Sequence, residues 1–240
     1  MDEKIKNSLV VFAWEEGKVS LPLRQLEELP GNSTNPKSYD YPVIFQRIEG
    51  ATWETVVENP DPRVLKNMIR EAKYYSDQGA GAILTSCGFN AIYQKKIAQE
   101  IDIPFYSSSL LQISFIQAVF GEEREIIVIT ANKDSLSKEH FVETGTKDLS
   151  NVTIYGMMEE CQEWQNINSF ERKMDLDKLR EEIVHFSRRI SKRHVKPGAI
   201  LLECTDLPPF AKIFKEETGL PVFDYMTLVN YVQSTINIKK

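Results

Sequence analysis

The sequence predicts an α/β protein with two pseudo-symmetric lobes, each a mainly parallel sheet flanked by helices, and an active-site cleft between the lobes. Three observations predict this architecture. Short runs rich in Val and Ile alternate with segments of helical periodicity. The runs are apolar throughout, which is typical of strands buried on both faces of a parallel sheet. One segment of the first half of the chain also recurs in the second half.

Eight short apolar runs are expected to be strands. Their lengths are typical of buried strands, and polar or turn-forming residues separate them. In chain order they are residues 8–13, 43–48, 81–84, 103–106, 125–130, 152–155, 198–202 and 220–223.

Two amphipathic helices are the clearest of those expected between the strands. Asp61 and Pro62 are suited to the N-cap and the first helical position of one helix, and Gly79 marks its end. The other helix repeats apolar side chains from Leu176 to Ile190 and ends in Lys and Arg residues, which complement the helix dipole. Strands that alternate with helices predict βαβ units.

The composition is that of an ordinary globular protein. The 240 residues include 29 Lys or Arg and 35 Asp or Glu, which gives a net charge of −6, and 42% are hydrophobic. This acidic balance argues against nucleic acid or an anionic membrane as a partner. The chain begins without a secretory signal pattern, and no apolar run approaches the ~20 residues that cross a bilayer. We therefore expect a soluble, cytoplasmic protein whose three cysteines are reduced.

An internal repeat divides the chain into two units offset by 117 residues. Residues 81–87 read GAILTSC and residues 198–204 read GAILLEC, with five of seven positions identical. The same offset aligns the apolar–Pro–apolar triplets 103–105 and 220–222, and it aligns the strands that open each half. Two copies packed about a pseudo-two-fold axis would place equivalent residues opposite each other across a cleft.

Cys87 and Cys204 end equivalent strands of this repeat, each just before a helical segment. Ligands of parallel α/β sheets bind beyond the carboxyl ends of the strands, so we expect the two thiols on opposite sides of one pocket. A helix N-terminus is expected to lower the pKa of such a cysteine. A thiolate facing a thiol can take a proton from one face of a carbon acid and return one to the other face, without a cofactor.

The remaining cysteine and the histidines predict no further site. Cys161 has no cysteine at the repeat-equivalent position and is expected to be a small buried apolar residue. No CxxC pair occurs, and His140, His185 and His194 lie far in sequence from both cysteine motifs. We therefore expect neither a metal site nor a cofactor.

With these paired motifs, most of the chain resembles the aspartate/glutamate/hydantoin racemase superfamily. Residues 204–208, CTDLP, are similar to the second cysteine motif of that family. The resemblance implies that Cys87 and Cys204 are the acid/base residues. It further implies that Asp206 assists the second thiol and that Thr205 contacts the substrate.

The first motif departs from the family pattern. The family usually has Cys-Asn-Thr, whereas this chain has Cys87-Gly88-Phe89-Asn90. Gly88 still offers an unobstructed backbone N–H, and Phe89 makes the pocket more apolar. We expect Gly88, Phe89 and Asn90 to face the substrate, with a specificity that differs from plain aspartate or glutamate.

Other strand ends supply further candidate substrate contacts. The resemblance implies a hydroxyl contact at Thr130, and Ser107 and Ser108 follow another strand. At least one serine of this run is expected to cap the helix that begins near Leu110. Trp14 ends the first strand and either lines the pocket or packs under a long loop over residues 15–40.

The resemblance also implies discontinuous lobes, with residues 1–102 and 216–240 in the first and 103–215 in the second. The expected function is a cofactor-independent racemase or epimerase that acts on an amino acid or a related carboxylate. A decarboxylase or cis–trans isomerase of a small dicarboxylate is one alternative, and a non-catalytic small-acid-binding protein is another. The expected partner is a small-molecule carboxylate substrate, and a homodimer is left open.

Overall fold

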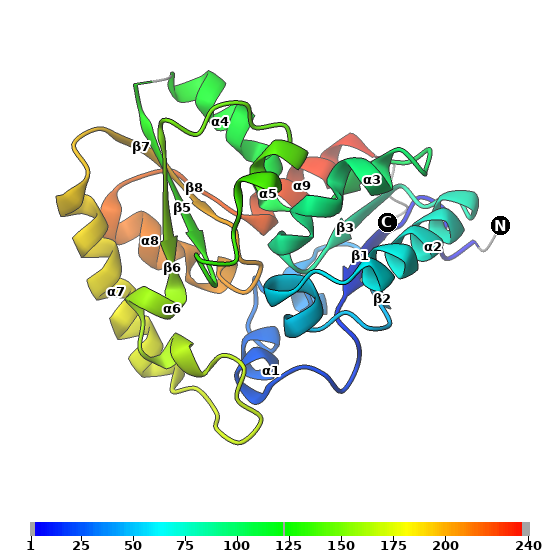
Figure 1. Ribbon diagram of the computed structural model, residues 1–240, viewed down its shortest axis with the longest axis horizontal. Coiled ribbons are helices and arrows are strands. Elements are labelled where there is room, and N and C mark those ends of the chain that lie inside the picture. Colours follow the sequence, from blue (N-terminus) through cyan, green and yellow to red (C-terminus); the bar gives the residue numbers. More distant parts are fainter. Residues whose placement is uncertain (1–2, 122, 237–240) are drawn as a thin grey trace.

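Two four-stranded parallel sheets form the centres of the two lobes (Figure 1). The computed structural model describes residues 3–121 and 123–236. The strand order is β2-β1-β3-β4 in the first sheet and β6-β5-β7-β8 in the second, so one topology occurs twice. The strands are β1 Leu9–Ala13, β2 Val43–Arg47, β3 Ala82–Thr85, β4 Phe105–Tyr106, β5 Glu125–Thr130, β6 Val152–Gly156, β7 Pro197–Leu202 and β8 Val222–Phe223.

The predicted fold class is confirmed, and all eight expected strands are present with small shifts at their ends. The central strands β1, β3, β5 and β7 carry the apolar runs of the repeat and are almost completely buried. Each of them has a neighbouring strand on both sides and helices over both faces of its sheet, which explains why its apolar residues are continuous and do not alternate.

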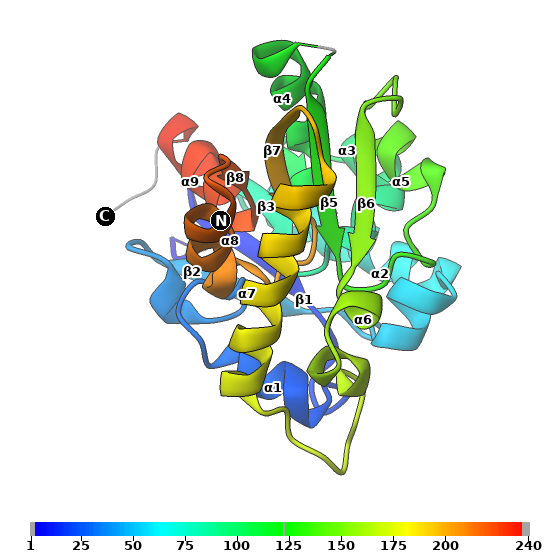
Figure 2. The same cartoon turned by 90° about the vertical axis from the view of Figure 1, so that its left-hand side faces the viewer.

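Helices connect the strands in both lobes (Figure 2). The α-helices are α1 Leu21–Glu27, α2 Pro62–Asp77, α3 Gln94–Ala98, α4 Ile113–Phe120, α5 Lys138–Glu143, α6 Met157–Glu160, α7 Leu176–Arg193, α8 Ala211–Thr218 and α9 Tyr225–Thr235. Short 3-10 helices are η1 Pro36–Ser38, η3 Gly88–Tyr93, η4 Ser109–Gln112, η5 Glu163–Asn166 and η6 Pro208–Phe210, and η2 Glu54–Glu58 is a π-helix. Within the described residues, no helix is both long and apolar enough to span a membrane.

The two helices predicted from capping and periodicity are α2 and α7. Asp61 caps α2, as expected, by accepting a hydrogen bond from the backbone N–H of Arg63. The expected loop over residues 15–40 instead contains α1. The helix begins there because the hydroxyl of Ser20 caps it and Pro22 lies in its first turn, a signal that the sequence analysis overlooked.

The chain crosses between the lobes twice, slightly later than expected. Strand pairing places the crossovers after the approximate boundaries expected at 102/103 and 215/216, since β4 still pairs with β3 and β8 still pairs with β7. Parallel pairing of Ile83 with Phe105, and of Ile200 with Val222, keeps each short strand in the sheet of its own lobe. After these strands α4 packs on the second sheet, and α9 packs on β1 and β3 of the first.

The two crossovers contact each other. Gln112 Nε2 donates to the carbonyl oxygen of Asp224 at 3.0 Å, and Thr227 Oγ1 donates to Gln112 Oε1 at 3.1 Å. One continuous cluster of buried apolar side chains extends through both lobes, and a smaller cluster lies beneath α9. Cys161 is 1% exposed within the larger cluster, as expected of a small buried residue. The lobes are therefore joined through a shared core.

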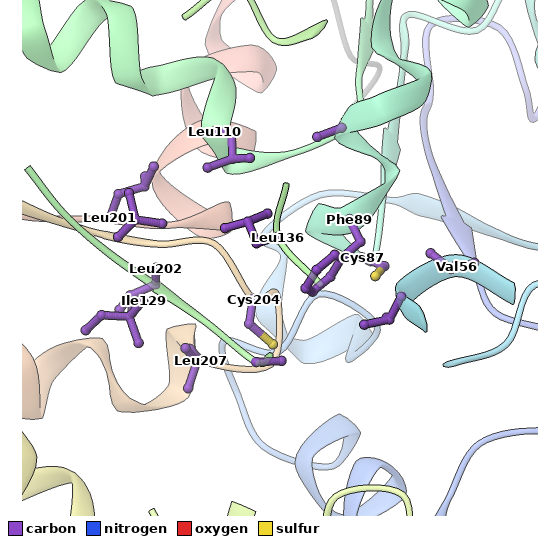
Figure 3. Close-up of a cluster of buried hydrophobic side chains, with 14 of the residues drawn as sticks. Val56, Cys87, Phe89, Leu110, Ile129, Leu136, Leu201, Leu202, Cys204 and Leu207 are labelled. Atoms are coloured by element: carbon purple, nitrogen blue, oxygen red, sulfur yellow. The ribbon is translucent and has the colours of Figure 1, made fainter. Parts of the chain in front are cut away.

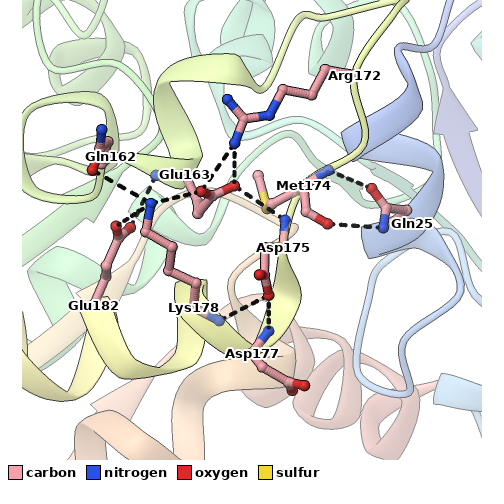
Figure 4. Close-up of polar contacts among 9 residues, drawn as sticks. All are labelled: Gln25, Gln162, Glu163, Arg172, Met174, Asp175, Asp177, Lys178 and Glu182. Atoms are coloured by element: carbon pink, nitrogen blue, oxygen red, sulfur yellow. Dashed lines mark hydrogen bonds and ion pairs between the residues drawn. The ribbon is translucent and has the colours of Figure 1, made fainter.

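A buried carboxylate organises the segment that precedes α7 (Figure 4). Glu163 is 2% exposed and accepts hydrogen bonds from Lys178 Nζ at 3.0 Å, from Arg172 at 3.3 Å and from the backbone N–H of Asp175 at 3.1 Å. Burial alone would raise the pKa of Glu163, but these N–H donors and positive charges outweigh it and the pKa is lowered.

This segment also holds α1 of the first lobe. Gln25 and Met174 exchange two hydrogen bonds, of 2.7 and 3.1 Å, and Ser20 Oγ donates to the carbonyl oxygen of Ile167 at 2.5 Å. The second lobe thus positions a helix of the first lobe.

We predict that Glu163→Gln lowers the free energy of unfolding at pH 7 by roughly 2 kcal/mol, because charge-assisted hydrogen bonds of a buried group are lost. The pKa of Glu163 is depressed in the folded state, so its contribution is present above its ordinary value of 4.5. The difference between variant and wild type should shrink as the pH falls below that value. Urea unfolding at several pH values measures it.

Glu216→Gln is the matched control, since Glu216 pairs with Lys212 on the surface of α8 and its side chain is 62% exposed. This change should alter stability by less than about 0.5 kcal/mol. Equal effects of the two substitutions, or a difference that does not depend on pH, would contradict the role assigned to Glu163.

Candidate active site

A small cavity lies at the carboxyl ends of both sheets, and residues of both lobes line it. Its volume is about 40 Å³, room for only about three water molecules. The lining includes both cysteines of the repeat, together with Trp14, Glu27, Trp53 and Asp206. Figure 3 shows Cys87 and Cys204 in one buried cluster with Phe89, at the junction of the lobes.

A larger cavity of about 640 Å³ adjoins the first and shares Trp14, Leu23 and Trp53 with it. The rings of Trp14 and Trp53 meet edge to face with their centroids 6.3 Å apart. These three side chains border both cavities. The first-strand tryptophan therefore lines the pocket, one of the two roles expected for it.

Cys87 follows β3 and is the N-cap residue of η3. Its side chain is nearly buried, at 7% exposure. Burial and the nearby carboxyl of Glu203 raise the pKa of the Cys87 thiol far above its ordinary value. The backbone N–H of Phe89 and the indole of Trp14 oppose this shift, because they favour the thiolate. Trp14 Nε1 is itself a buried atom without a hydrogen bond of normal geometry.

Cys204 has a carboxyl partner. Its thiol donates to Asp206 Oδ2 at 3.8 Å, and Asp206 Oδ1 accepts from Asn32 Nδ2 at 2.7 Å. Burial raises the pKa of Asp206 to about 7, although the amide of Asn32 opposes the shift. Burial and the charge of Asp206 also raise the pKa of the Cys204 thiol well above its ordinary value. Asn32 thus fixes the carboxyl group that faces the sulfur.

The expectation that a helix N-terminus lowers the thiol pKa is wrong for both cysteines. The helical turns that follow them are short 3-10 helices, and each sulfur lies in a poorly solvated site beside carboxyl groups. Desolvation and the negative charge of the carboxyl groups both disfavour the thiolate, and together they outweigh the weak dipole of a short 3-10 helix. Both thiols are therefore neutral at pH 7.

The two cysteine loops contact each other reciprocally about the pseudo-two-fold axis. Thr205, which follows Cys204, donates a short hydrogen bond to the carbonyl oxygen of Ser86, which precedes Cys87. In the equivalent place Gly88, which follows Cys87, lies against Glu203. A Cβ atom at position 88 would be 2.1 Å from Glu203 Oε1 and 2.5 Å from its carbonyl oxygen. Only glycine fits at this position.

Sequence reasoning missed Glu203, Glu27 and Trp53. Glu203 is completely buried and its Oε2 accepts a hydrogen bond from Thr130 Oγ1 at 2.7 Å. The available signal was a carboxyl group at the end of an apolar strand, at the repeat position that Ser86 fills in the first half. Glu27 is the last residue of α1, in a region where the sequence predicts a loop and hence no candidate.

Seven of the predicted site residues line the cavity, and four do not. Those at the cavity are Trp14, Cys87, Gly88, Phe89, Cys204, Thr205 and Asp206. Asn90 is buried within η3, and Thr130 binds Glu203. Ser107 Oγ donates to Gln94 at 2.8 Å, and Ser108 caps Leu110 as expected of one serine in that run. Among the described residues, no group of three or more His, Cys, Asp or Glu side chains is placed to hold a metal ion.

Comparison with known sequences finds relatives that share one name, dimethylsulfoniopropionate lyase. No family model matches the chain. It is 28% identical over 210 residues to dimethylsulfoniopropionate lyase of Durusdinium sp. clade D, which covers 85% of this chain and 69% of that protein. It is 29% identical over 220 residues to dimethylsulfoniopropionate lyase 5 of Emiliania huxleyi (strain CCMP1516), covering 85% of this chain and 42% of that protein. The chain thus spans between about two fifths and two thirds of the length of these curated relatives.

Comparison with solved structures shows the fold. An aspartate racemase homologue from Pyrococcus horikoshii OT3 superposes with a TM-score of 0.59 at 16% identity, over 95% of this chain and 99% of that one. Allantoin racemase from Pseudomonas fluorescens gives 0.60 at 13% identity, over 95% and 89%. Unliganded arylmalonate decarboxylase gives 0.52 at 13% identity, over 94% and 92%. These likenesses show the fold alone, and it is the two-lobed fold that the resemblance leads us to expect.

We predict that Gly88→Ala lowers the free energy of unfolding by about 1–3 kcal/mol, because its methyl group cannot be accommodated without moving a cysteine loop. The double variant Gly88→Ala/Glu203→Ala should recover only part of this loss, since the clash with the backbone carbonyl remains. Denaturant unfolding of both variants and of Glu203→Ala alone measures the coupling. A Gly88→Ala protein as stable as wild type would refute the close contact.

Proposed function

We propose that the chain is a lyase that removes the α-proton of a small carboxylate and expels a leaving group from the β-carbon. Its substrate would be a zwitterion of the dimethylsulfoniopropionate class. The observation that carries the proposal is the match to proteins named dimethylsulfoniopropionate lyase over 85% of a chain whose paired cysteines line one cavity.

Proton transfer from the carbon next to a carboxylate connects the activities of this fold. A racemase returns a proton to that carbon. A lyase instead uses the electron pair of the broken C–H bond to form a double bond and expel a group from the neighbouring carbon. For a sulfonium substrate, the base takes the α-proton and the C–H electron pair forms the Cα–Cβ double bond. The Cβ–S bond breaks and its electron pair stays on sulfur. The products are an unsaturated carboxylate, a neutral sulfide and one proton on the base.

Cys204 is the base that the geometry favours. Its thiol already donates to Asp206, which Asn32 orients from the far side. A carboxylate with a pKa of about 7 takes the thiol proton more readily than an ordinary aspartate. The resulting thiolate then faces the cavity, and Asp206 is the group that would release the proton to solvent after each turnover.

The charge of the cavity suits a cationic leaving group. Among the described residues that line it, two are acidic, Glu27 and Asp206, and none is Lys, Arg or His. Burial raises the pKa of Glu27, and Arg47, 3.9 Å away, partly offsets this effect. A sulfonium group near Glu27 and the ring of Trp53 would gain both Coulomb and cation–π stabilisation. Trp14 Nε1 and the Ser86 hydroxyl are the donors that we assign to the substrate carboxylate.

We expect Cys204→Ser and Asp206→Asn to lower kcat for release of dimethyl sulfide from dimethylsulfoniopropionate by roughly 10²–10⁴-fold, the usual contribution of a positioned acid–base group. Activity should rise as the pH increases through about 7, because Asp206 must lose its proton to act as a base. Headspace gas chromatography of the sulfide measures both effects.

Cys161→Ala is the matched control, since Cys161 is buried outside the cavity. It should retain wild-type activity in folded protein. The lyase mechanism is wrong if Cys204→Ser keeps full activity, or if wild type releases no sulfide while exchanging α-hydrogen of another acid.

If Glu27 binds the cationic end of the substrate, its replacement should weaken binding of the sulfonium compound more than binding of an analogue without that charge. Glu27→Gln should raise KM for dimethylsulfoniopropionate about tenfold with little change in kcat, because it removes a charge that binds the cationic end. The inhibition constant of 4-methylpentanoate, an isostere with an uncharged CH group in place of the sulfonium, should change much less. The exposed Glu16 offers a control, and Glu16→Gln should leave both constants unchanged. Equal losses for the cation and the isostere would argue against a cation subsite.

A racemase or epimerase is the second candidate, favoured by the fact that two cysteines line one cavity. A two-base mechanism needs both thiols, whereas elimination needs one base. Cys87→Ser should therefore reduce lyase activity less than Cys204→Ser but abolish racemisation. Incubation with amino acids and hydantoins in D₂O separates the two activities, since only racemisation places deuterium at a stereocentre. Saturable binding without turnover of any compound would instead indicate a small-acid-binding protein.

A further inference from the structure

The most unusual buried group of the molecule is the side chain of Glu203. Its exposure is 0%, and among the residues that the structure describes its side chain has one hydrogen bond, which Oε2 accepts from Thr130 at the end of β5. Its other oxygen, Oε1, is buried without a hydrogen-bond partner among the described residues. A buried carboxylate with one unsatisfied oxygen is strongly disfavoured, whereas a protonated carboxyl group is tolerated.

The position of this carboxyl group is explained by a difference between the two halves of the repeat. At the equivalent position of the first half is Ser86, and the residue that packs against it is Thr205. Across the axis, Gly88 has no side chain, and Glu203 Oε1 lies only 2.1 Å from where a Cβ atom at position 88 would be. The absence of a side chain at one cysteine loop thus makes room for a carboxyl group from the other loop.

Both thiols respond to this group. The titratable residues that it influences are Cys87 from the first lobe and Cys204 from its own loop, and Asp206 acts on the same two thiols. Glu203 is the strongest charged influence on Cys87, whereas Asp206 is the strongest on Cys204. Burial raises the pKa of Glu203 to about 7, and the hydroxyl of Thr130 opposes the shift. The group therefore changes charge near neutral pH.

We propose that Glu203 is a positioning residue that joins the two cysteine loops as a neutral acid and controls, by its charge, whether Cys87 can form a thiolate. Below neutrality Glu203 is uncharged, so burial is the main effect that opposes ionisation of the thiol. Above neutrality the charge of the carboxylate opposes it as well. The inference goes beyond the lyase proposal and does not rest on it, because it concerns the ionisation of the thiols and not the reaction of a substrate.

The test is the rate of alkylation of each cysteine by iodoacetamide between pH 5.5 and 9.5, followed by peptide mass spectrometry. In wild type, the logarithm of the Cys87 rate should rise with a slope below one around pH 7, because Glu203 acquires its charge there. In Glu203→Gln the slope should return to one. The Cys87 rates of the two proteins should agree below pH 6, and the variant should be about three- to tenfold faster at pH 8.5.

Two further variants separate charge from packing. Thr130→Val removes the hydrogen bond that favours the carboxylate, so the flattened part of the Cys87 profile should move to higher pH. Asp206→Asn should accelerate Cys204 more than Cys87, because Asp206 is the stronger influence on Cys204. Cys161, which lies in the core, should stay unreactive throughout.

Equal Cys87 rates in wild type and folded Glu203→Gln at pH 8.5, including no reaction in either, would overturn the proposal. So would an acceleration of the same size at every pH, which would indicate loosened packing and not removal of a charge. Thermal unfolding identifies protein that has lost its fold. If Glu203→Gln does not fold, the shift expected for Thr130→Val decides, and a Cys87 profile that stays in place refutes the inference.

Discussion

The reciprocal contact of the two cysteine loops is the constraint on which the rest of the site depends. Each loop packs the residue after its cysteine against the residue before the other cysteine, Thr205 on Ser86 and Gly88 on Glu203. This contact brings the carboxyl ends of two separate sheets together and leaves a cavity of only about 40 Å³ between them. Any side chain at position 88 would force the loops apart. The departure of the first motif from the racemase pattern is therefore a packing requirement of this chain as well as a change in its chemistry.

Burial of carboxyl groups next to the thiols gives the site its chemical character. A desolvated thiol beside an acid is neutral, so neither cysteine is ionised and able to act as a base at neutral pH. Proton transfer from Cys204 to Asp206 becomes easier when a cation binds closer to the sulfur than to the carboxylate, since the negative charge moves to the sulfur in this step. A zwitterionic substrate with a cationic group would thus help to ionise the base that attacks it. A simple dicarboxylate would have the opposite effect, which is a physical reason to favour the lyase over the dicarboxylate alternatives.

The surroundings hold this arrangement in place from both lobes. The second lobe reaches α1 through Gln25 and Met174, and α1 carries Glu27 and Leu23 into the cavity. The segment that makes this contact is organised by the buried Glu163. At the opposite end, α4 and α9 each pack on the other lobe and contact each other through Gln112. Relative movement of the lobes would disturb a shared apolar core, so adjustments to a ligand are more easily made by the tryptophans that border both cavities.

The sequence by itself determined the strands, the two long helices, the repeat and the two cysteines, because these depend on local periodicity and on direct comparison of the two halves. Buried parallel strands need continuous apolar residues, and Asp61 with Pro62 marks a helix start wherever the helix packs. Only the tertiary structure decided the thiol pKa values, the role of Glu203 and the contribution of α1. Those depend on which groups are desolvated together, and residues such as Thr130 and Glu203 meet across a separation of 73 positions. Thr130, expected at the substrate, instead binds Glu203, since a buried carboxyl group needs a donor more than a solvated ligand does.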